Sequence, residues 1–270
     1  MPAKTEFTTE QRIRAAGLPN HGKTYTVIPH GYVIDETRKE LQAAGFHIDK
    51  EIYKTNLDGQ VAQGIYHLNH GTDSDMGLMF AWSNSYNKMM RFKCAVGAQV
   101  FICMNGVVSG DLSNYSRKHT GNALQEATGT IRHQIANART FYDQLVKDKE
   151  LLKGITLTKS QQAAIVGQLL IEQDVLTLSQ VGIVKRELET PSYSYNSPAD
   201  SAWTLYNHVT LALKDSHPMS YLNDHQKLHN FFIDQYTVTK KFVQPELNFE
   251  EEIEEEEEVV EINDNGVIFL

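Results

Sequence analysis

The sequence predicts an α+β fold, with an N-terminal, mostly antiparallel β-sheet, then a C-terminal helical region and a disordered acidic tail. Residues 23–121 alternate short strand-like segments with turn signals such as Asp58-Gly59 and Asn105-Gly106. Residues 122–245 instead space their apolar side chains at the period of amphipathic helices. Both parts are expected to form one domain, preceded by an N-terminal arm at 1–22 and followed by the tail at 246–270.

The expected strands are apolar runs that turn residues separate. They cover residues 24–33, 46–54, 61–68, 78–83, 89–95 and 98–103. One helix, at 35–44, interrupts them and ends at Gly45, a residue typical of helix C-caps. A short helix is also expected in the arm, at 10–16.

Four helices are expected in the second part. The apolar positions of residues 122–150 predict a single helix of about seven turns. The next begins after Thr158, which would cap it. A third begins at Ser197-Pro198, a capping residue followed by proline at the first helical position. The fourth covers residues 221–236.

The acidic tail changes the meaning of the net charge of −9. It holds eleven of the 34 acidic residues and none of the 25 basic ones, which leaves 23 acids and 25 bases in residues 1–245. A mildly basic body therefore carries a polyanion, which is expected to stay solvated. The tail is either a solubility device or a mimic of nucleic-acid backbone whose apolar tip recruits partners. The residues expected to act in the second case are Glu254, Glu255, Glu256, Glu257, Glu258, Phe269 and Leu270.

Several other classes of protein are disfavoured. No apolar run approaches the roughly 18 residues that a membrane span needs, and the N-terminus lacks the apolar core of a signal peptide. Cys94 and Cys103 are too few for a disulfide framework and are expected to be reduced and buried. These observations predict a protein of the cytoplasm that does not bind membranes.

Two motifs suggest cofactors, but neither has the context that it needs. Residues 17–24 match the G-x-x-x-x-G-K-[ST] nucleotide loop, yet a polar, helix-prone segment precedes them and a strand-like one follows. The His67/His70 and His225/His229 pairs lack a recognisable third ligand and general base. We therefore expect no metal, no cofactor and no enzymatic activity, although bound zinc or nucleotide would favour an enzyme.

A nucleic-acid groove is the strongest candidate site. Residues 80–93 interleave aromatic and basic side chains, the combination that holds single strands by base stacking and phosphate contacts. Trp82 and Tyr86 are expected to stack on bases. Cations at Lys88, Arg91 and Lys93 are expected to hold the backbone, Arg91 and Lys93 from one strand face. The remaining candidates for the groove are Lys54, Arg117 and Lys118, with His119 beside them.

These same segments carry a family resemblance. Residues 80–87 (FAWSNSYN), 96–106 (VGAQVFICMNG) and 117–121 (RKHTG) resemble the signature of a phage- and plasmid-borne family catalogued as domain of unknown function 932. Residues 202–210 (AWTLYNHVT) resemble its C-terminal helix, and the likeness spans roughly residues 24–235. One departure is that Asn87-Lys88 replaces the family's usual Gly. The resemblance implies a mobile-element setting and no settled reaction.

The tail shows a second resemblance, to the acidic tails of phage and bacterial single-stranded DNA-binding proteins. We therefore predict a phage-type single-stranded DNA-binding protein of DNA replication, recombination or repair in the bacterial host cytoplasm. Its tail would compete with DNA and recruit replication or transcription proteins. The alternatives are a single-strand annealing recombination protein and a host-factor-binding inhibitor that uses the tail as a DNA mimic. The sequence leaves open whether the protein forms a homo-oligomer.

Overall fold

The computed structural model describes residues 5–20, 25–70, 73–102, 105–108, 116–117, 119–214 and 216–241. The strands are β1 (Thr5–Thr8), β2 (Ile48–Asn56), β3 (Val61–Leu68), β4 (Met76–Ser85), β5 (Phe92–Val100), β6 (Asn105–Val108) and β7 (Ser116–Arg117). The helices are α1 (Glu10–Arg14), α2 (His30–Ala43), α3 (Ala123–Ala136), α4 (Ala138–Lys153), α5 (Lys159–Ile171), α6 (Leu178–Glu189), α7 (Ala202–Leu213) and α8 (Tyr221–Lys241).

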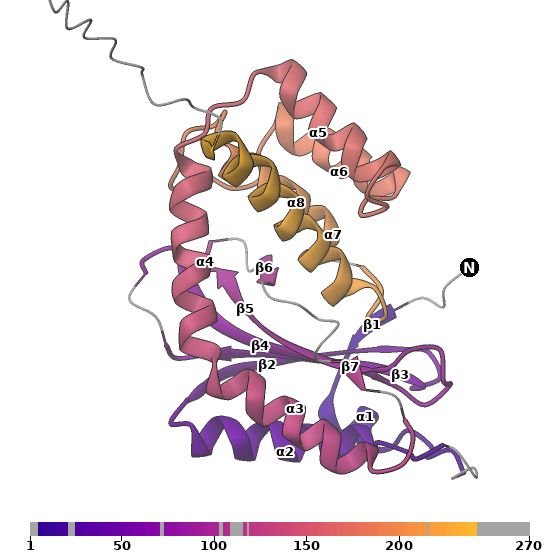
Figure 1. Ribbon diagram of the computed structural model, residues 1–270. Helices are drawn as coiled ribbons and strands as arrows, with labels where there is room; N and C mark the ends of the chain where they lie inside the picture. Colours follow the sequence, from indigo (N-terminus) through magenta and orange to yellow (C-terminus); the bar gives the residue numbers. More distant parts are fainter. Residues whose placement is uncertain are drawn as a thin grey trace, which may run out of the picture.

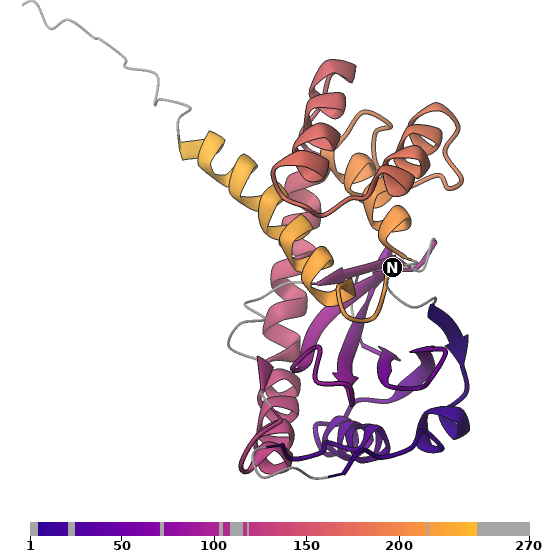
Figure 2. The same ribbon diagram turned by 90° about the vertical axis from the view of Figure 1, so that its right-hand side faces the viewer.

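The predicted α+β architecture is confirmed. The seven-stranded sheet has the order β1-β2-β3-β4-β5-β6, and β7 pairs with the start of β5 outside that path. Each of these pairings is antiparallel. α2 and α3 lie on one side of the sheet and α5 to α8 on the other, while α4 runs from one side to the other (Figure 1; Figure 2). Helices therefore cover both faces of the sheet.

The central strand β4 is buried on both faces. Phe80 and Trp82 belong to the main core, which includes residues of α2 and α3. Met79 and Ala81 point the other way and pack with Tyr221 at the start of α8. Successive residues of a strand face opposite sides of the sheet, so a strand covered twice is apolar without alternation. All ten residues of β4 are buried for this reason.

The strand predictions held where turn signals were clear and failed beside Pro29 and Gly97. β3 has the predicted bounds, and Gly59 in the turn before it has a φ of 72°. The strand expected at 24–33 was wrong, because Pro29 precedes the first turn of α2 and Tyr25 makes only an isolated bridge. The strands expected at 89–95 and 98–103 are one strand, β5, which continues through Gly97.

Some helix predictions are confirmed and others were wrong. The long helix expected at 122–150 is two helices, divided at Asn137, whose side chain donates to the His133 carbonyl at 2.9 Å. The cap at Thr158 is confirmed, and α6 was not predicted. The start at Ser197-Pro198 was wrong, because α7 begins four residues later, where the Ser201 hydroxyl accepts from the Thr204 N–H.

The predicted N-terminal arm is part of the sheet. β1 forms the outer strand beside β2, and α1 packs against α2. Arg38 of α2 donates to both Glu10 of α1 and Glu51 of β2, at 2.7–3.0 Å to the former. This ion cluster fastens the arm to the domain. Within the described ranges, no helix combines the length and apolarity that crossing a membrane would require.

Trp82 requires a glycine on the neighbouring strand, because a Cβ at Gly64 would lie 2.5 Å from the Trp82 indole nitrogen. Gly64→Ala is therefore expected to lower the free energy of unfolding by about 1–3 kcal/mol through overpacking. The matched control is Gly129→Ala in α3, where a Cβ would meet nothing within 4 Å and helix propensity should add about 0.5–1 kcal/mol. Urea denaturation measures both, and equal effects of the two variants would contradict the packing account.

Candidate nucleic-acid interface

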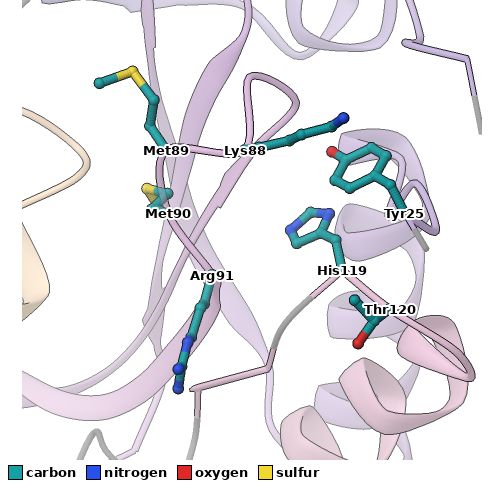
Figure 3. Close-up of a pocket in the computed structure, with 7 residues that line it drawn as sticks. All are labelled: Tyr25, Lys88, Met89, Met90, Arg91, His119 and Thr120. Carbon is teal, nitrogen blue, oxygen red and sulfur yellow. The ribbon is translucent and has the colours of Figure 1, made fainter. Parts of the chain in front are cut away.

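One open pocket collects residues from three separate segments of the chain. It has a volume of about 460 Å³ and lies between the β4–β5 turn, the segment before α2 and the loop after β7. Met90 and Arg91 line one side, Tyr25, His119 and Thr120 line the other, and Lys88 reaches across toward Tyr25 (Figure 3). Among the described residues, those that line it are Tyr25, Lys88, Met89, Met90, Arg91, His119 and Thr120, and none of these is a carboxylate.

Hydrogen bonds to backbone carbonyls connect the segments that form the pocket walls. The Thr26 N–H donates to the His119 carbonyl at 2.8 Å, and the Thr26 hydroxyl donates to the Gly121 carbonyl at 2.9 Å. Gly121 has a φ of 56°, in the region that favours glycine. On the side of the turn, the Tyr25 hydroxyl donates to the Tyr86 carbonyl at 3.2 Å. Segments distant in sequence are thereby fixed to one another at the end of the sheet.

The two cations of the pocket come from the β4–β5 turn. The Lys88 ammonium lies 4.8 Å from the centroid of the Tyr25 ring, within the range of a cation–π contact. Its backbone φ is 63°, a left-handed conformation that glycine adopts most easily. Arg91 is exposed. Neither cation has an ion-pair partner in the part of the chain that the structure describes, so both are available to an anion.

His119 lines the pocket as a buried, neutral group. Its ring lies parallel to that of Tyr25 within 2°, with centroids 5.4 Å apart. Only 5% of the residue is exposed, and among the described residues neither ring nitrogen finds a hydrogen-bond partner. Burial lowers the pKa of His119 to about 4, because the charged imidazolium loses its hydration. At neutral pH the imidazole therefore offers one donor and one acceptor.

Tyr86, His30 and Asn84 form a buried, hydrogen-bonded cluster next to the residues that line the pocket. The Tyr86 ring centroid lies 3.8 Å from that of His30, and the Tyr86 hydroxyl accepts from the backbone N–H of His30 at 2.7 Å. Asn84 donates to the Ile28 carbonyl at 2.7 Å and bonds His30 Nδ1 at 3.0 Å. Burial also lowers the pKa of His30, to about 3. These side chains position the Tyr25 segment and the turn rather than a ligand.

A family model described as "Domain of unknown function (DUF932)" matches the chain over residues 18–229. The chain belongs to this family. The match confirms the resemblance seen in the sequence, and it includes the residues that line the pocket. No curated protein and no solved structure matches the chain.

In this DUF932 domain, two of the predicted site residues do not offer a ring on which a nucleobase could stack. Trp82 is fully buried, and its indole N–H donates to the Tyr66 hydroxyl at 3.2 Å. Tyr86 is 3% exposed and has its ring against His30. The prediction that both stack on bases was wrong, because neither ring has a face open to solvent. The aromatic ring that does line the pocket is that of Tyr25.

Two predicted cations lie elsewhere. Lys93 donates to Asn223 Oδ1 of α8 at 2.9 Å, and burial followed by the charge of Arg91 lowers its pKa. Lys54 is 5% exposed and donates to the Lys214 carbonyl at 2.6 Å. Neither lines the pocket, because both are engaged with the helical part. The expected basic face is therefore smaller than predicted and centres on Lys88 and Arg91.

The remaining predicted residues are placed in part or not at all. The backbone of Arg117 in β7 pairs with Phe92, so this residue lies next to the turn that carries Arg91. Outside the described residues are the Arg117 side chain, Lys118, Cys103 and the tail with Glu254, Glu255, Glu256, Glu257, Glu258, Phe269 and Leu270. In the nucleotide-loop motif, Gly17 follows α1 rather than a strand, and residues 21–24 are also undescribed.

Sequence reasoning missed Tyr25, Met89, Met90 and Thr120, which line the pocket. Tyr25 was assigned to a strand and Thr120 was only part of a motif. The available signal was the motif at 117–121, whose one glycine follows the histidine and suggests a tight turn beside it. Within the described parts of the domain, no group of three His, Cys, Asp or Glu is arranged to hold a metal ion.

The lowered pKa values imply an acid-sensitive fold. The unfolded chain takes up a proton on each histidine below about pH 6.5, while folded His119 does so only near pH 4. Stability should therefore be lost as the pH falls between these values, by up to about 1.4 kcal/mol per pH unit for each such histidine. Between pH 6.5 and 5, the free energy of unfolding should fall less steeply for His119→Phe than for wild type, because the variant lacks this titrating group. The difference in slope should approach about 1.4 kcal/mol per pH unit, and urea unfolding measures it. Identical pH slopes would mean that folded His119 titrates normally.

Proposed function

We propose that this DUF932 protein binds single-stranded DNA, with the pocket at the β4–β5 turn as a principal contact. The observation that carries the proposal is the presence of both Lys88 and Arg91 on an open pocket that has no carboxylate among its described lining residues. Neither cation has an ion-pair partner among the described residues, so both can contact phosphates, and such contacts supply most of the sequence-independent affinity for nucleic acids.

The pocket favours a single strand over a duplex. Its walls include the Tyr25 ring and the side chains of Met89 and Met90, which are apolar or polarisable. An unstacked base can contact such walls, whereas the bases of a duplex are stacked inside the helix. The backbone of Arg117 lies beside the turn, since β7 pairs with the first residues of β5. We propose that Arg117 and Lys118 extend the contacts to the DNA backbone beyond the pocket.

The acidic tail fits the same function. Its eleven acidic residues could compete with DNA for the cations of a body that carries 23 acids and 25 bases. We propose that residues Glu254–258 act in this competition and that Phe269-Leu270 recruits replication or transcription proteins. The setting would be phage or plasmid DNA replication, recombination or repair in the host cytoplasm. Strand annealing would require the same contacts and would add DNA-dependent ring assembly, which light scattering detects.

Removing both pocket cations tests the proposal. Lys88→Ala with Arg91→Ala should weaken binding to oligo-dT and flatten the slope of log affinity against log salt by about 1.4, roughly 0.7 for each lost phosphate contact. Fluorescence anisotropy at several salt concentrations measures both quantities. The control is Lys185→Ala in α6, a residue with a 76% exposed side chain outside the pocket, which should leave the slope unchanged.

Three results would contradict the proposal: no binding of oligo-dT by the wild-type protein, tighter binding of duplex than of single strand, or an unchanged slope in the double variant. The first result together with copurification of a host protein would favour an inhibitor module.

Deleting residues 246–270 tests the tail. The truncated protein should bind oligo-dT more tightly by about 1 kcal/mol or more at low salt, and the difference should shrink at high salt because screening weakens the competition. Anisotropy titrations of both proteins at two salt concentrations measure this. Equal affinities at both concentrations would show that the tail does not compete.

A further inference from the structure

Tyr25 stacks on the His119 ring and Thr26 bonds its backbone, but the two ring nitrogens have no hydrogen-bond partner in the described part of the chain. The residue is buried beside the pocket. Native proteins rarely leave a buried polar group unsatisfied, and exceptions often mark a place where a ligand or water completes the hydrogen bonds. The imidazole is one of the pocket's lining groups and faces it from the wall opposite Met90 and Arg91 (Figure 3).

The residues around His119 limit what the ligand can be. Tyr25 covers one side of the imidazole, with its ring parallel to it, so the free hydrogen-bonding positions lie at the ring edge. Lys88 and Arg91 supply positive charge within the same pocket. A volume of about 460 Å³ is within the range of about 300–1,000 Å³ typical of small-molecule sites. The pocket thus combines cations for a phosphate, a neutral donor and acceptor, and apolar walls.

We propose that the pocket holds one nucleotide of the bound strand, with backbone phosphates at Lys88 and at Arg91, whose side chains point to different sides of the pocket (Figure 3), and with the polar edge of the base at the His119 imidazole. This inference rests on the proposed function and adds a base contact to it. A nucleobase carries both donors and acceptors on its edge, which suits an uncharged imidazole. His119 then contributes affinity without neutralising a phosphate.

The cations and the imidazole therefore have separable effects. Loss of Lys88 or Arg91 changes the salt dependence, because each removes a phosphate contact. Loss of the His119 nitrogens changes affinity alone, by about tenfold for a hydrogen bond of ordinary strength. His119→Phe keeps a flat ring beside Tyr25 and removes an unsatisfied buried polar group, so it should fold at least as stably as wild type.

The test uses the full-length protein and three probes: dTMP, thymidine and inorganic phosphate. In NMR titrations, wild type should bind dTMP at least tenfold more tightly than either other probe. The imidazole ¹⁵N signals of His119, assigned by their absence in His119→Phe, should shift with dTMP and not with phosphate. His119→Phe should lose about tenfold on dTMP and on oligo-dT with an unchanged salt slope. His47→Phe, an exposed residue outside the pocket, is the matched control and should bind as wild type does.

Equal binding of dTMP and inorganic phosphate would overturn the inference in favour of a plain anion site. Unchanged dTMP affinity in His119→Phe would overturn it in favour of a water-filled pocket wall. Both results leave the proposed function standing if wild type still binds oligo-dT in a salt-dependent way. Absence of oligo-dT binding overturns the proposed function itself.

Discussion

Burial of β4 on both faces is the constraint on which the rest of the structure depends. The strand lies between β3 and β5, with α2 and α3 over one face and the start of α8 over the other. A strand enclosed in this way offers no side chain to a ligand along its length. Chemistry is consequently confined to the ends of the central strands, where the chain leaves the core. The β4–β5 turn is such an end, and it carries the two cations of the pocket.

The sequence predicted what local chemistry controls. The turn at Asp58-Gly59 and the apolar residues after it predicted where β3 begins, and the capping side chain of Thr158 predicted where α5 begins. Both signals depend only on residues that are adjacent in the sequence. β5 was predicted as two strands, because glycine usually interrupts a strand; Gly97 instead lies within β5, where the Met79 side chain and the backbone of β6 pack closely. That close packing depends on strand pairing and is invisible in a local window.

Some residues of the candidate site could be identified from local sequence, whereas others depend on contacts between distant segments. Lys88 and Arg91 could be named from the sequence, because charge in a polar turn is a local property. Trp82 could not be placed correctly, since its burial depends on the space above Gly64 in the next strand. The meeting of Tyr25 with His119 depends on a backbone hydrogen bond between distant segments. The class of site that the residue pattern suggests stays a prediction, whereas identifying the residues that line the pocket required the fold.

Lys88 combines a left-handed backbone conformation, which glycine usually adopts, with a positively charged side chain. A side chain other than glycine in the left-handed region costs on the order of 1 kcal/mol, and here that cost coincides with a charge aimed over Tyr25. Glycine would relax the turn and remove the charge in a single step. If Lys88 contacts a phosphate as proposed, stability and affinity have opposite requirements at this position, and a screen for thermal stability alone would select against the lysine.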